Sequence, residues 1–163
     1  MVDNNISQTV KNLEAAFAGE SMANRKYLFF ARRCRELGAH EVAEVFEETA
    51  AQETEHALAH LELLYPADTL SVEKMLAMAI EGETHEYTEM YPAFRHTALE
   101  EKAHAAVAEI DEQIEESKMH AERFTATLKI AEKRFAALTR IEERHANRYR
   151  NTLAKFSAQE SDS

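Results

Sequence analysis

The segments Glu53-Thr-Glu-His56 and Glu142-Glu-Arg-His145 each place a glutamate and a histidine three residues apart. In a helix, this spacing brings the two side chains onto one face, a single turn apart. In both segments the pair lies on the stripe that otherwise carries apolar residues, so both carboxylates are expected to face the core. A buried carboxylate needs a compensating charge, and this pattern favours a metal ion.

Apolar residues recur in alternating steps of three and four along four stretches of the chain, which is the pattern of amphipathic helices. Each stretch also carries glutamate on its apolar stripe. These inward glutamates are Glu20, Glu53, Glu83, Glu86 and Glu142. They cannot all stay ionised in a dry core without a large desolvation cost, whereas two divalent cations nearly cancel their charge.

The order of these residues matches the ligand pattern of ferritin-like carboxylate proteins, in which two helices each give a glutamate and two each give Glu-x-x-His. The predicted fold is therefore all-α: a ferritin-like four-helix bundle that forms a single domain over residues 1–163. Three glycines, two prolines and 30% charged residues agree with helix almost throughout. Residues 65–71 are the predicted linker, and Ser71 is expected to begin a helix.

Two further histidines, His104 and His120, are not predicted to be metal ligands. Glu101 and His104 repeat the spacing, but they lie one step off the apolar stripe and are expected to be a solvated pair. His120 has Ser117 three residues before it, in place of a glutamate, and is therefore not predicted as a ligand.

Four stretches resemble the rubrerythrins: residues 18–27 (AGESMANRKY), Glu53-x-x-His56, residues 82–92 (GETHEYTEMYP) and residues 142–149 (EERHANRY). The resemblance covers about residues 6–97 and 127–153, and both Glu-x-x-His pairs match in type and order. It implies a diiron site in a ferritin-like bundle and the reduction of hydrogen peroxide to water.

Carried over to this chain, the resemblance implies two iron ions per subunit and a catalytic role for Glu86, Tyr27 and Tyr91. Glu86 is implied to compete with His56 for one iron as the oxidation state changes, and the two tyrosines to orient the carboxylates. The implied metal ligands are Glu20, Glu53, His56, Glu83, Glu86, Glu142 and His145. Ligand type favours iron or manganese, with zinc as a further alternative.

The chain departs from typical rubrerythrins in its cysteine content. Those proteins carry a rubredoxin-like domain whose iron is held by four cysteines, and this chain has a single cysteine, Cys34. It therefore resembles the short members of the family. The expected electron source is an external rubredoxin-like or flavin donor.

A second departure is a length difference between the two halves. Glu20 and Glu53 are 33 residues apart, whereas Glu83 and Glu142 are 59 apart, an excess of 26. The excess, about residues 102–127, lacks glycine and proline and is predicted to be a helical insertion between the third and fourth metal-binding helices. It is expected to form a projecting helical hairpin that reverses near residues 111–117. A second subunit is expected to cover its apolar stripe, which consists of Val107, Ile110, Ile114, Ala121 and Phe124.

These features predict a homodimer, with exchange of hairpins across residues 65–71 as one form of it. The net charge of -11 argues against nucleic acid and anionic membranes as partners. An apolar run of membrane-spanning length and a signal-peptide pattern are both lacking, which predicts a cytoplasmic protein. Three functions remain open: a peroxidase, a ferritin-like ferroxidase or iron-handling protein, and a structural metal-bound bundle without turnover.

Overall fold

The structure is a computed structural model that describes the backbone of residues 7–161 and the side chains of residues 7–154. Every regular element in this part of the chain is helical, so the all-α prediction is confirmed. The chain divides into two compact units, Met1–Leu70 and Ser71–Ser163, and the boundary falls inside the predicted linker 65–71. Each unit is described by itself, and the single domain stays a prediction.

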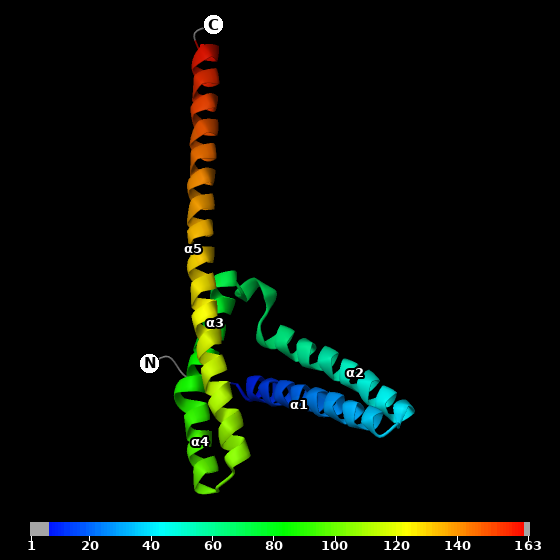
Figure 1. The fold of residues 1–163 in the computed structure, drawn as a ribbon. Coiled ribbons are helices and arrows are strands. Elements are labelled where there is room, and N and C mark those ends of the chain that lie inside the picture. The colour runs from blue at the N-terminus through cyan, green and yellow to red at the C-terminus, as the bar shows by residue number, and fades with distance from the viewer. Residues whose placement is uncertain (1–6, 162–163) are drawn as a thin grey trace. The chain divides into compact units, whose positions relative to one another are not determined.

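The first unit is a helical hairpin of α1 (Gln8–Glu36) and α2 (His40–Leu64), followed by the short 3₁₀ helix η1 (Ala67–Thr69) (Figure 1). Ser7 caps α1, because its side-chain oxygen accepts a hydrogen bond from the amide of Val10 at 3.2 Å. Between the two long helices, Gly38 adopts a φ of 77°, a left-handed conformation that glycine takes without strain.

Small residues let α1 and α2 pack closely. Ala43, Ala50 and Ala57 recur every seventh residue on α2 and are 0%, 0% and 8% exposed, and Ala31 on α1 is also buried. Val42 is 50% exposed whereas its neighbour Ala43 is fully buried, so the packed face of α2 runs along the alanines. An alanine stripe was missed because alanine contributes little to an apolar periodicity.

The second unit contains α3 (Val72–His85), the π-helical turn η2 (Glu86–Met90), α4 (Tyr91–Glu100) and α5 (His104–Ser161), a helix of 58 residues. Ser71 caps α3 by accepting a hydrogen bond from the amide of Lys74 at 3.1 Å, as predicted. The π turn precedes Pro92, which has no amide to bond to the carbonyl four residues earlier.

The predicted helical insertion is helical, but its predicted reversal near residues 111–117 is wrong. The chain turns at residues 101–103, where Lys102 adopts a left-handed φ of 58°. From His104 onward, α5 runs without interruption antiparallel to α4 and α3, and the guanidinium of Arg95 on α4 bonds to Asp111 on α5. Lysine rarely adopts a left-handed conformation, so its presence at position 102 did not indicate a turn.

The apolar stripe of the insertion is covered within its own unit. Leu76 and Glu83 of α3 line one groove together with His120 and Phe124 of α5, and Ala121 is 6% exposed. The expectation that a second subunit covers this stripe is therefore corrected. Figure 1 shows α5 continuing past the end of α3, and several apolar side chains further along the helix are exposed, among them Phe135 and Leu138.

Candidate metal centre

The first unit brings together Glu20 of α1 with Glu53 and His56 of α2. Each of these residues offers one ligand atom, and the three atoms lie within 4.8 Å of one another. Nδ1 of His56 lies 3.0 Å from Oε2 of Glu53, one helical turn away. Among the described residues, these three form the one group of at least three acidic, histidine or cysteine side chains that is compact enough to hold a metal ion.

The charges of the two carboxyl groups are linked. A hydrogen bond from the Glu20 carboxyl to the Glu53 carboxylate raises the pKa of Glu20, and desolvation raises it further. The same hydrogen bond, together with the one to His56, lowers the pKa of Glu53. Without metal, these shifts favour a protonated Glu20 beside an ionised Glu53. Paired carboxylates commonly behave in this way when no cation neutralises their charge.

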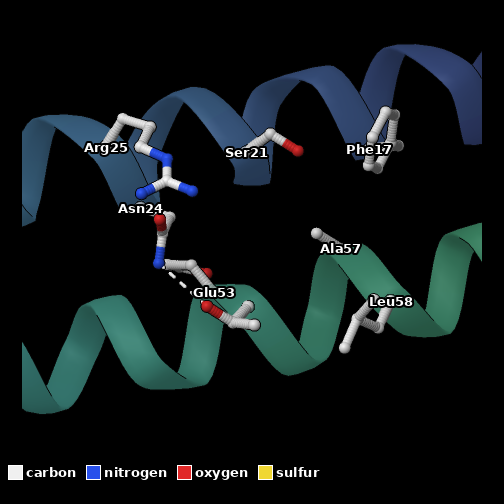
Figure 2. Close-up of a pocket in the computed structure, with 8 residues that line it drawn as sticks. Phe17, Ser21, Asn24, Arg25, Glu53, Ala57 and Leu58 are labelled. Atoms are coloured by element: carbon white, nitrogen blue, oxygen red, sulfur yellow. Dashed lines mark hydrogen bonds between the residues drawn. The ribbon is translucent and has the colours of Figure 1, made fainter. Parts of the chain in front are cut away.

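A polar contact fixes the helix spacing beside this cluster. The side-chain amide nitrogen of Asn24 donates to the backbone carbonyl of Ala50 at 2.6 Å and to the hydroxyl of Thr54 at 2.9 Å. Figure 2 shows Asn24 on α1 reaching across to α2 beside Glu53. Asn24 therefore holds Glu20 and Glu53, each within one turn of these contacts, at a constant separation.

The second unit holds a related group of side chains between α3 and α5. Ser117 is 4% exposed, and its hydroxyl donates to Oε2 of Glu86 at 2.9 Å. Nδ1 of His120 lies 3.4 Å from Oε2 of Glu83. That Glu83 oxygen is buried and has no hydrogen-bond partner with acceptable geometry, so the contact with His120 is a charge contact rather than a hydrogen bond.

The sequence did not predict that His120 lies beside Glu83. Glu83 and Ser117 are 34 residues apart, almost the same as the 33 residues between Glu20 and Glu53. The second half therefore repeats the spacing of the first. Glu83 corresponds to Glu20 and His120 corresponds to His56, but Ser117 stands at the position that corresponds to Glu53. The near-equal spacing was the available signal, and it was set aside because Ser117 is not a ligand type.

Glu142 and His145 lie elsewhere on α5. Their side chains are 75% and 53% exposed, and Nδ1 of His145 is 3.8 Å from Oε2 of Glu142. Glu142 follows Ser117 by 25 residues on an uninterrupted helix, or about 37 Å at 1.5 Å per residue. The structure does not bring this pair to Glu83 and Glu86 of the same chain, and its role as a ligand pair stays a prediction.

The two predicted tyrosines differ in their surroundings. Tyr91 follows the π turn, and desolvation followed by the charges of Glu86 and Glu83 raises the pKa of its hydroxyl. Tyr91 therefore stays protonated and able to donate a hydrogen bond beside these carboxylates. The ring of Tyr27 packs against Phe46, with 5.9 Å between the ring centroids. The catalytic roles of Tyr27, Tyr91 and Glu86 remain predictions.

The donor set fits iron. Carboxylate oxygens and imidazole nitrogens suit ferrous and manganous ions, whereas zinc usually takes fewer carboxylates. The convergence of Glu20 and Glu53 and the unpartnered oxygen of Glu83 both mark positions where a cation would satisfy the carboxylates. Together, an all-helical fold and carboxylate-histidine clusters on facing helices define the class of ferritin-like metal proteins.

Comparison with known proteins gives the family. The family model described as Rubrerythrin matches residues 11–153. Rubrerythrin of Porphyromonas gingivalis is 39% identical over 134 residues, which cover 75% of this chain and 66% of the relative. Rubrerythrin of Nitratidesulfovibrio vulgaris is 39% identical over 106 residues, covering 58% of this chain and 56% of the relative. The chain thus spans less than two thirds of the length of both relatives.

A solved structure of nigerythrin in its fully reduced, all-ferrous state shares 32% sequence identity, with a TM-score of 0.39 and coverage of 81% of this chain and 73% of that one. The chain belongs to the rubrerythrin family, a family of diiron proteins of oxidative stress defence. Among the described residues, every helix is too short or too polar to cross a bilayer.

Proposed function

We propose that this protein is a non-haem diiron peroxidase, which reduces hydrogen peroxide to water with electrons from an external donor. The observation that carries the proposal is the convergence of the ligand atoms of Glu20, Glu53 and His56 within 4.8 Å. Membership of an oxidoreductase family supports the same reaction class. The proposed metal ligands are the predicted set: Glu20, Glu53, His56, Glu83, Glu86, Glu142 and His145.

Two ferrous ions, when bound, would supply the two electrons that together with two protons reduce one hydrogen peroxide to two water molecules. The protein's part is to bind the metal and to position its ligands. Glu53 and His56 come from adjacent turns of one helix, and Asn24 sets the distance of that helix from Glu20. This rigid first unit is suited to constant ligands.

Glu86 is suited to the different role of a carboxylate that changes its contacts. It begins the π turn η2, and π turns occur often at functional sites because their backbone is wider and less regular than that of an α-helix. Its carboxylate is held by Ser117 through one hydrogen bond at 2.9 Å. Tyr91, protonated beside Glu86 and Glu83, is the proposed donor that orients these carboxylates.

The external donor is proposed to be a rubredoxin-like protein or a flavin protein. The single cysteine, Cys34, cannot by itself provide the four thiolates that hold an iron in a rubredoxin-like centre. A chemically reduced sample is therefore expected to complete one turnover of peroxide and then stop until a donor is added.

Stopped-flow oxidation of the ferrous protein, with peroxide and with oxygen in separate runs, tests the function. A marked preference for peroxide supports the peroxidase. Equal or faster reaction with oxygen selects an iron-oxidising protein of ferritin type, and inertness toward both selects a structural metal site. Glu55→Ala is a matched control for Glu53→Ala, because Glu55 is an exposed glutamate on the same helix.

A further inference from the structure

The second half of α1 carries a run of positive charge on an acidic protein. Residues 21–35 contain five basic residues and no acidic residue, whereas the rest of the chain contains 14 basic and 30 acidic residues. Two of these cations are paired within the first unit, Arg33 with Glu36 and Arg35 with Glu47. Within the described part of the chain, the other three cations form no salt bridge; they are Arg25, Lys26 and Arg32. The positive charge of this segment is therefore only partly neutralised.

The unpaired cations share one face of α1 with exposed apolar side chains. At 100° per residue, six residues of this face fall within about 120° of one another around the helix and about 17 Å along it. We call them the basic patch: Met22, Arg25, Lys26, Phe29, Arg32 and Arg33. Met22 and Phe29 are 56% and 51% exposed, and the guanidinium carbon of Arg32 lies 5.4 Å from the centre of the Phe29 ring. Arginine, methionine and aromatic residues are enriched in protein interfaces, so this composition indicates a binding surface.

The basic patch lies across one helix from the proposed metal ligands. Glu20 converges with Glu53 and His56 of α2, so it lies on the inner face of α1. Phe29 follows Glu20 by nine residues, or about 180° around the helix, and lies on the outer face. An α-helix with its side chains is about 10–12 Å thick. A partner on the basic patch is thus separated from the metal ligands by little more than one helix.

A row of aromatic rings connects the basic patch with the inner face of α1. The ring centroids of Phe29 and Phe30 are 6.1 Å apart, and those of Phe30 and Phe46 are 5.6 Å apart. Phe46 in turn contacts Tyr27, with 5.9 Å between the centroids. Tyr27 follows Glu20 by seven residues and therefore shares its face of the helix. The four rings form a closely spaced path from the surface toward the metal ligands, which suits the transfer of electrons.

The character of the basic patch favours a transient partner over a second copy of the chain. Permanent subunit contacts are large and mainly apolar, whereas this surface sets two apolar side chains among four cations. Its charge is complementary to an acidic protein surface. The proposed function, in addition, requires electrons from outside the chain.

We infer that the basic patch is the docking surface for a small electron-carrier protein with acidic side chains around its redox centre. The inference rests on the proposed function. Attraction between opposite charges speeds the encounter, and Phe29 and Met22 supply apolar contact in the complex. Each reduced carrier gives up one electron and leaves in its oxidised form, so two carriers replace the two electrons that one peroxide consumes.

Isothermal titration calorimetry tests the docking with two probes, an acidic rubredoxin and an acidic flavodoxin, each oxidised so that no electron passes. The wild-type protein is expected to bind at least one probe, with an affinity that falls as salt is raised. Lys26→Glu/Arg32→Glu is expected to weaken this binding by about tenfold or more, because two attractions become repulsions. Lys133→Glu/Arg140→Glu makes the same change in net charge at exposed positions of α5, and wild-type affinity is expected.

Phe29→Ala separates a specific contact from general attraction between charges. It keeps every cation of the basic patch, so it is expected to weaken binding by about fivefold and to leave the salt dependence unchanged. Circular dichroism confirms for each variant that the helix content is retained.

Three results of the calorimetry overturn the inference: no binding of either probe by the wild type, equal weakening by the two charge-reversal pairs, or wild-type affinity in Phe29→Ala. Binding of the wild type to anionic vesicles in place of the probes also overturns it and identifies a membrane as the occupant. A change in the sedimentation of the protein alone on Lys26→Glu/Arg32→Glu overturns it in favour of a second copy. No peroxide is present in these measurements, so their outcome is separate from failure of the peroxidase proposal.

Discussion

The hydroxyl of Ser117 donates a 2.9 Å hydrogen bond to Oε2 of Glu86, at the position that mirrors Glu53 in the first half of the chain. A neutral donor therefore occupies a place where the first unit has the carboxylate of Glu53, a proposed metal ligand. Without metal, this arrangement avoids a second negative charge beside Glu86.

Replacing Ser117 by glutamate is expected to have opposite effects with and without metal. In the presence of chelator, the added carboxylate next to Glu86 lowers the midpoint of thermal unfolding, because two like charges are brought together in a buried place. With cobalt(II), the additional ligand raises affinity by about tenfold or more, measured by titration of the cobalt absorption bands. Ser117→Ala, which only removes a hydrogen bond, is expected to cost about 1 kcal/mol and to bring no gain in affinity. Equal affinity in Ser117→Glu and wild type would contradict the assigned ligand position.

Glu53→Ala is expected to lower metal affinity by more than the 10- to 100-fold that is typical for loss of a residue that merely supports a ligand. Glu53 is shared between Glu20 and His56, so its removal breaks both contacts of the cluster. Metal content after dialysis against a defined free-metal buffer measures the effect. Glu55→Ala, on the exposed side of the same helix, should retain full metal, and a matching loss there would show general destabilisation.

Asn24→Ala is expected to reduce the free energy of unfolding by about 1–3 kcal/mol, since it leaves the carbonyl of Ala50 and the hydroxyl of Thr54 without their shared donor. Urea denaturation of the metal-free protein measures this change. Asn12→Ala provides the comparison, because Asn12 makes an exposed contact with Gln8 within one helix. If both variants lose the same free energy of unfolding, the hydrogen bonds of Asn24 between α1 and α2 have no special role.

Asp111→Asn is expected to destabilise the protein at neutral pH and to have no effect in acid. The guanidinium of Arg95 lowers the pKa of Asp111, so the ionised carboxylate stabilises the folded state. This contribution is fully present above the unfolded pKa of about 3.9 and is lost as the pH falls through the lower folded pKa. Urea midpoints measured from about pH 7 to about pH 2 should therefore converge for the two proteins. Glu112→Gln, at the exposed neighbouring position, should show no such convergence.

The sequence predicted the helical fold and the pairing of Glu53 with His56 because both depend on local spacing, whereas Glu20 meets this pair through the packing of α1 on α2. The wrong reversal point had a different origin: Lys102 makes the turn in a left-handed conformation, for which lysine carries no signal. His120 is not predicted as a ligand because Ser117 stands three residues before it, and the contact of His120 with Glu83 depends on how α3 and α5 pack. The π turn at Glu86 also escaped notice, since only Pro92 hinted at an irregular helix there.

Because α5 is one uninterrupted helix, the direction in which side chains point at its start determines the direction in which they point at its end. A single residue inserted near position 130 would rotate everything beyond it by about 100° relative to Ser117 and His120, whereas seven inserted residues would restore the phase to within about 20°. The directions of the Glu142 and His145 side chains are therefore fixed relative to that of His120, because all three lie on α5. Insertions of about two turns would keep the two ends of α5 in the same relative orientation, whereas insertion or deletion of one residue would change that orientation.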